Sequence, residues 1–195
     1  NKLALTFLEM KKKTGDIPYI LMRYLVLVLS AIPNLWLFYM IFTPLTAYPV
    51  YWFLNLFYNA SILNGNIILI NQAISIEMIE ACIAGSAYYL LLVLNLSVPK
   101  IDLKRRIKMV AFSFSIFLAI NILRIFLLSL VAISGSSFFD ITHRIFWYAL
   151  STIFVAAIWF AEVKAFKIKE IPFYSDIRFL YKNTRKQNKE QGLKK

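Results

Sequence analysis

The sequence predicts an all-α membrane protein with about four transmembrane helices and with both ends in the cytoplasm. Three observations predict this class. The chain of 195 residues is 60% hydrophobic, whereas soluble domains are usually about 45–50% apolar. The apolar residues form long uncharged runs. The Lys and Arg residues gather in the segments between those runs, as they do in membrane proteins.

Four stretches are long enough to cross a hydrocarbon core of about 30 Å, which needs about 20 apolar helical residues. The first, Tyr19–Phe42, contains Pro33 and is expected to kink there. The other three lie at about Ile79–Val98, at Met109–Ile133 and at about His143–Val163.

The basic residues predict the orientation. Of 22 Lys and Arg residues, four lie in residues 1–17, five in residues 99–108 and ten from Lys164 onward, and none lies in residues 43–78 or 134–142. Because cytoplasmic connections are enriched in Lys and Arg, the three basic segments are expected inside and the other two outside. The net charge of +12 is therefore attributed to topology and not to a nucleic-acid partner.

A fifth apolar stretch, Ala47–Leu63, is short and rich in Tyr, Trp and Phe, which favour the membrane interface. We expect it to form a helix lying on the outer surface. Asn64-Gly65 is a turn signal. The apolar segments Ile67–Ile70 and Ala73–Ile79 that follow are expected to form a small hairpin above the bundle.

Arg23 and Arg124 lie inside the first and third predicted spans. Arg23 lies near the inner end of the first span and can reach the cytoplasmic surface with its long side chain. Arg124 is nine residues from Ile133, or about 13 Å from the outer end of its helix. Burial at that depth costs at least ~3 kcal/mol, and such residues usually mark function. The structural alternative is that Arg124 and Asn121, three residues earlier on the same face, only clamp helices together.

The topology also places the single cysteine and the single histidine in the outer half of the bundle. Cys82 lies about one turn from the outer start of the second span, and the pair His143-Arg144 begins the fourth. Considered separately, Cys82 is expected to be a small packing residue. The pair His143-Arg144 is expected to cap its helix at the membrane interface. Together with Arg124, however, they bring a thiol close to cations that favour its thiolate. A paired thiol and an oxyanion donor are the minimum for acyl transfer through a thioester.

Three short motifs in this order resemble the exosortase/archaeosortase family of membrane-embedded, sortase-like cysteine transpeptidases. They are Cys82-x-x-Gly85, Asn121-Ile122-Leu123-Arg124 and Asp140-Ile141-Thr142-His143-Arg144. The resemblance covers about residues 60–165. It implies that Cys82 is the nucleophile, that Arg124 is a proton donor, and that His143 or Arg144 stabilises the transition state. Many members have about eight spans and a Ser-Gly after the cysteine, so four spans and Ile83-Ala84 indicate a small, divergent branch.

The resemblance also implies the reaction. A secreted protein held by a C-terminal motif, a transmembrane helix and a basic tail would be cleaved through a thioester and then released or transferred to a lipid or glycan. The site would face outward from the cell membrane. The chain would divide into a cytoplasmic segment 1–18, a transmembrane catalytic domain 19–166 and a basic cytoplasmic tail 167–195.

The alternative is a non-enzymatic small membrane protein, such as a transporter subunit or assembly factor, in which Arg124 is a polar clamp or an anion site. No cofactor or metal is expected, because a structural zinc site needs about four Cys or His ligands and the sequence has one of each.

Overall fold

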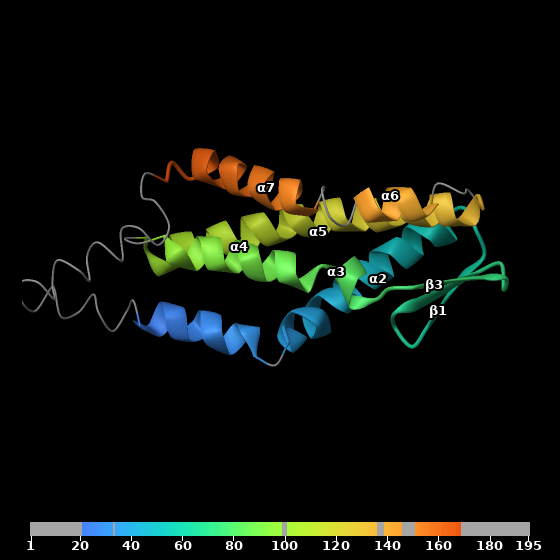
Figure 1. The fold of residues 1–195 in the computed structure, drawn as a ribbon, viewed down its shortest axis with the longest axis horizontal. Helices are drawn as coiled ribbons and strands as arrows, with labels where there is room; N and C mark the ends of the chain where they lie inside the picture. Colours follow the sequence, from blue (N-terminus) through green and yellow to red (C-terminus); the bar gives the residue numbers. More distant parts are fainter. Residues whose placement is uncertain (1–20, 33, 99–100, 136–138, 146–150, 169–195) are drawn as a thin grey trace, which may run out of the picture.

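A computed structural model describes residues 21–32, 34–98, 101–135, 139–145 and 151–168 (Figure 1). Its helices run along one long axis, and a small sheet lies at one end of that axis. The elements are a helix over Leu21–Ala31, α2 (Trp36–Asn55), β1 (Ala60–Leu63), β2 (Ile67–Ile70), β3 (Ile74–Glu77), α3 (Glu80–Ile83), α4 (Gly85–Ser97), α5 (Leu103–Ile133), α6 (Phe139–Ile145) and α7 (Ser151–Ala165).

Three helical segments among the described residues are long and apolar enough to cross a membrane. They are α2, with a mean hydropathy of 1.3, Glu80–Ser97, also 1.3, and α5, with 2.6. The prediction of a mostly helical chain with long apolar helices is confirmed, but a three-stranded sheet departs from the expected all-α class. The fourth predicted span, His143–Val163, includes residues outside the described part. The number of crossings and their orientation therefore stay predictions.

The first predicted span differs from the structure at its outer end. The helix over Leu21–Ala31 stops just before Pro33, and α2 begins at Trp36 and continues to Asn55 through two further prolines. The expected end at Phe42 is therefore wrong. Proline frees one backbone carbonyl of a helix, but neighbouring side chains and local adjustments can satisfy such carbonyls in a membrane helix. The prolines within α2 do not end it.

The separate surface helix expected over Ala47–Leu63 is also wrong. Residues up to Asn55 continue α2, and Ala60–Leu63 form β1. Composition alone does not show where a short apolar, aromatic-rich stretch changes from helix to strand.

The small hairpin is confirmed, and β1 adds a third strand to it. The strand order is β1-β2-β3, with both pairs antiparallel. Asn64 and Gly65 adopt positive φ values of 51° and 78° in the turn between β1 and β2. Ile68 and Ile70 of β2 are fully buried, so one face of the sheet covers the core.

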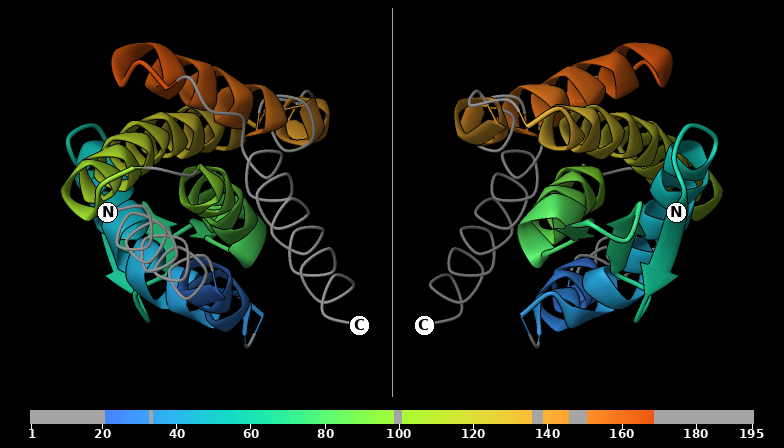
Figure 2. Two further views of the ribbon diagram at one scale, coloured as in Figure 1. Left: turned by 90° about the vertical axis from the view of Figure 1, so that its left-hand side faces the viewer. Right: turned by 90° about the vertical axis from the view of Figure 1, so that its right-hand side faces the viewer.

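An aromatic cluster joins α2, α4 and α5 below the sheet. The Phe42 and Tyr88 rings are stacked with their centroids 3.6 Å apart. Phe114 and Phe117 of α5 meet Tyr88 edge to face at 5.4 and 4.8 Å. Edge-to-face pairs are favourable beyond the area they bury. The end views in Figure 2 show α4 beside α2 and α5, which also pack directly against each other. This packing fixes the level of α4 against α5, and with it the residues that precede α4.

Candidate active site

The helix that carries Cys82 is broken directly after it. The sequence predicts one continuous span over Ile79–Val98, but α3 ends at Ile83 and α4 begins at Gly85 (Figure 1). Ala84 between them is left-handed, with φ 58° and ψ 44°. The last carbonyls of a helix have no partner within it. The break therefore leaves backbone acceptors around Cys82 in the interior of the bundle.

Two side chains of α5 supply the missing donors. Asn121 Nδ2 donates to the carbonyl oxygens of Cys82, at 3.0 Å, and Ile83, at 3.4 Å. Arg124 Nη2 donates to the carbonyl oxygens of Ala81, at 3.4 Å, and Cys82, at 3.2 Å. A cation also suits the negative end of a helix dipole. The sequence-predicted pair of Cys82 and Arg124 is thus brought together, with Asn121 beside it.

Gly85 permits α2 to come close to the break. A Cβ atom at Gly85 would lie 2.7 Å from Cε1 and 2.8 Å from Cζ of Tyr39. Any other residue at this position would force the Tyr39 ring to move. The Tyr39 ring therefore covers the beginning of α4 and helps hold α3 and α4 in their broken arrangement.

The surroundings of the Cys82 thiol combine partial burial with positive charge. Cys82 is a free, half-buried cysteine, whereas the Arg124 side chain is only 6% exposed. Arg124 interacts electrostatically with Cys82 and with Tyr88. Burial disfavours the charged thiolate and the nearby Arg124 charge favours it, so the two effects on the thiol oppose each other.

The predicted third site position lies on α6. His143 is half-buried and Arg144 is exposed, and α6 packs against α5. The hydrogen bonds that define the site join α3 to α5. The approach of His143 or Arg144 to Cys82 therefore stays a prediction.

Tyr88 is a site neighbour that the sequence analysis missed. Its side chain is fully buried, and its hydroxyl has no hydrogen-bond partner among the described residues. In the sequence it is one of many aromatic residues in an apolar run, so no local signal distinguishes it. Its proximity to Arg124 follows from the packing of α4 on α5.

A second polar cluster, also missed, joins α4, α5 and α7. Asn95 Nδ2 donates to Glu162 Oε2 at 3.1 Å and to Ser113 Oγ at 3.3 Å. Arg106 donates to the Asn95 carbonyl oxygen at 2.5 Å. Glu162 is 0% exposed. An acid within an apolar segment was the signal for this cluster, because ionisable groups at such positions face the bundle interior.

Two further arginines, like Arg124, donate to backbone carbonyls at the end of a helix. Arg23 Nε donates to the Leu96 carbonyl oxygen at 2.6 Å, and Arg106 Nη2 donates to the Val98 carbonyl oxygen at 2.7 Å. Both side chains are buried, so the expectation that Arg23 reaches the cytoplasmic surface is wrong. Each binds the C-terminal carbonyls of α4, as Arg124 binds those of α3. Arg124 differs from them in its position beside a thiol.

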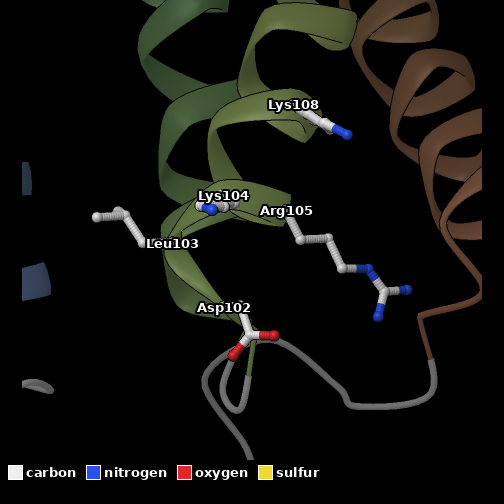
Figure 3. Close-up of a pocket in the computed structure, with 5 residues that line it drawn as sticks. All are labelled: Asp102, Leu103, Lys104, Arg105 and Lys108. Atoms are coloured by element: carbon white, nitrogen blue, oxygen red, sulfur yellow. The ribbon is translucent and has the colours of Figure 1, made fainter.

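A cavity of about 550 Å³ lies at the start of α5. Figure 3 shows Arg105 and Lys108 extending from this turn toward the side on which α7 lies. Arg124 is 21 residues further along α5 than Leu103, or about 30 Å away. These cations belong to the basic segment that the sequence assigns to the cytoplasmic side, and the cavity is separate from the Cys82 site.

Among the residues that the structure describes, no group of three or more His, Cys, Asp or Glu side chains is placed to hold a metal ion. Comparison with protein-family models, with curated proteins and with solved structures finds no match to this chain.

Proposed function

We propose that this chain is a membrane-embedded cysteine transpeptidase or peptidase, similar to the exosortase/archaeosortase family. The observation that supports the proposal most is the pairing of Cys82 with Arg124 at the broken end of α3. A continuous helix would satisfy its own carbonyls. Here a buried cation and an amide donate to the backbone carbonyl of Cys82, which carries the only thiol of the chain. Helix breaks and buried charges in membrane proteins are typical of functional sites.

The proposed reaction has two steps. The Cys82 sulfur attacks a peptide carbonyl of a secreted protein, a C–S bond forms and the C–N bond breaks. The thiol proton passes to the leaving amine by way of Arg124, the proton donor that the resemblance implies. His143 or Arg144 stabilises the oxyanion. Water, or an amine or hydroxyl group of a lipid or glycan, then attacks the thioester and returns a proton to the thiolate.

The proposal is tested by replacing the chain in its native host with the Cys82→Ala variant. The C-termini of surface proteins are then read by mass spectrometry. We expect precursors that retain an apolar C-terminal segment and basic tail to accumulate only in this variant. Ser86→Ala, a small exposed position on α4, is the matched control. Identical C-termini in wild type and Cys82→Ala would remove the enzymatic proposal.

The second candidate is a non-enzymatic membrane protein in which Arg124 is a polar clamp. It is favoured by the resemblance of Arg124 to Arg23 and Arg106, which bind helix carbonyls without a thiol nearby. In that case Arg124 and Asn121 substitutions lower stability, and Cys82→Ala changes neither stability nor surface proteins.

A further inference from the structure

The geometry points to β3 as a docking strand for an extended segment of a substrate polypeptide beside Cys82. This inference rests on the proposed function, because it assigns a binding surface to the same site. It begins from the order of the sheet, in which β2 is central and β1 and β3 are edges. Within the described part of the chain, β3 pairs with β2 alone.

The register shows which backbone groups of β3 face away from β2. Met78 N–H donates to the Asn66 carbonyl oxygen at 2.8 Å. Hydrogen-bonded pairs alternate in an antiparallel ladder, so Ile76 and Ile74 also bond to β2. The residues between them, Ser75 and Glu77, therefore direct their N–H and C=O groups to the open side. No hydrogen bond within the described residues uses these groups.

The opposite edge of the sheet is partly covered. The Asn71 N–H, just after β2, donates to the Asn59 carbonyl oxygen at 2.8 Å. By the same alternation, Ala60 and Ile62 of β1 direct their backbone groups away from β2. The Ala60 N–H donates to Asn55 Oδ1 at 3.3 Å, and α2 packs against β1. The β3 edge is thus the one that can accept another strand.

One face of β3 is exposed to solvent, and its other face packs against the protein core. Ser75 and Glu77 are exposed, and Ile74 and Ile76 pack against the core. A strand added to such an edge gains main-chain hydrogen bonds, and its alternate side chains face the core side and the solvent side. An unpaired edge in lipid would carry unsatisfied polar groups, so this edge belongs in an aqueous or interfacial layer.

The position of β3 in the chain connects this edge to the nucleophile. β3 leads directly into α3 (Figure 1), and Cys82 follows Glu77 by five residues. The link is held in place, because Met78 is buried and the Cys82 N–H donates to the Ile79 carbonyl oxygen at 2.8 Å. A strand paired with Ser75 and Glu77 needs only a few more residues, at about 3.3 Å each, to bring a peptide bond to Cys82.

The occupant is therefore the extended outer segment of the secreted protein next to the bond that Cys82 attacks. Backbone pairing selects an extended conformation, which is also the conformation in which a peptide carbonyl is open to a nucleophile. It sets few limits on side chains, so specificity would come from contacts outside the edge.

A crosslinking experiment tests this placement. The probe is the uncleaved precursor that accumulates in Cys82→Ala cells. A photoreactive benzophenone residue is introduced at Ser75 of the Cys82→Ala chain, and in a matched variant at Ser61. Both side chains are exposed, and both residues pair with Leu69, so they lie in one row at opposite edges. We expect at least a tenfold stronger crosslink to the precursor from Ser75, at residues flanking the cleaved bond.

A second variant tests the backbone bonds themselves. Ser75→Pro removes an outward N–H without removing a bond to β2, a position at which an edge strand tolerates proline. Ser75→Ala keeps the N–H and is the control. We expect cleavage of the precursor to fall at least tenfold in Ser75→Pro, and within twofold of wild type in Ser75→Ala, with equal amounts of folded chain.

The failures are distinguishable. If no precursor accumulates in Cys82→Ala cells, the proposed function falls and this inference falls with it. If precursor accumulates but Ser75→Pro cleaves it at the wild-type rate, or Ser75 crosslinks only to a second copy of the chain, the docking strand is overturned and the proposed function stands.

Discussion

Arg124 on α5 donates a hydrogen bond of 3.2 Å to the backbone carbonyl of Cys82, one residue before α3 ends at Ile83. This contact is consistent with two roles of Arg124, one structural and one catalytic. As a helix cap it satisfies acceptors that the break leaves open. As a cation it lies beside a half-buried thiol. Substitutions can separate the two roles, because the first is measured as stability and the second as activity.

The capping role predicts a loss of stability on removing either donor. Asn121→Leu removes the side-chain donor of the Ile83 carbonyl and leaves the Cys82 carbonyl with Arg124 alone, and a buried unsatisfied acceptor costs about 1–3 kcal/mol. We expect a loss of that size in denaturant unfolding of the purified chain in detergent. Leu123→Ala, at an exposed position on the same helix, is the control. A loss no larger than the control's would show that the break does not need its caps.

The close approach at Gly85 predicts a steric defect with a specific suppressor. Gly85→Ala places a Cβ 2.7 Å from the Tyr39 ring, and overpacking of this kind typically costs about 1–3 kcal/mol. Tyr39→Leu removes the ring and is expected to reduce the cost of Gly85→Ala. Tyr39→Phe keeps the ring atoms that clash and should not suppress it. Equal behaviour of the two double variants in thermal unfolding would contradict the packing described here.

The buried cluster predicts strong coupling between Asn95 and Glu162. Asn95→Leu removes the donor of a fully buried carboxyl group, and breaking one partner of a buried polar pair is costly because the other is left behind. Replacing both partners by apolar residues can be nearly neutral. We therefore expect Asn95→Leu with Glu162→Leu to be more stable than Asn95→Leu alone. Additive losses in the double-mutant cycle would argue against the pair.

The orientation is tested by labelling from one side of the membrane. In the Cys82→Ala background, Asn64→Cys lies in the turn between β1 and β2, and Asp102→Cys lies just before α5. The absence of Lys and Arg from residues 43–78 predicts that an impermeant maleimide labels the first in intact cells and the second only after lysis. The reverse pattern would place the Cys82 end of the bundle inside.

The sequence predicted those features that depend on which residues can lie in a bilayer and which must contact water. Long uncharged runs predicted the apolar helices, and the apolar segments Ile67–Ile70 and Ala73–Ile79 predicted the hairpin. The co-location of Cys82 and Arg124 followed from counting positions along two predicted spans. These features depend on local composition and on the general thickness of a bilayer, so a single sequence is enough to predict them.

Other features depend on contacts between distant segments. The break at Ala84 has no local signal, because alanine favours a continuous helix and the left-handed residue is held by donors 37 and 40 positions away at Asn121 and Arg124. The continuation of α2 through two prolines likewise depends on its neighbours. Glu162 was overlooked because it stands at the edge of a basic segment, where an acid normally faces water.

In the proposed reaction Cys82 forms a thioester with its substrate, and hydroxylamine can trap this intermediate. Membranes containing the wild-type chain are incubated with the precursor from Cys82→Ala cells and with hydroxylamine, which attacks a thioester in place of the natural acceptor. We expect a product ending in a hydroxamate, read by mass spectrometry, and none from Cys82→Ala membranes. Cleavage that yields only a free carboxylate in hydroxylamine, or that persists in Cys82→Ala, would contradict it.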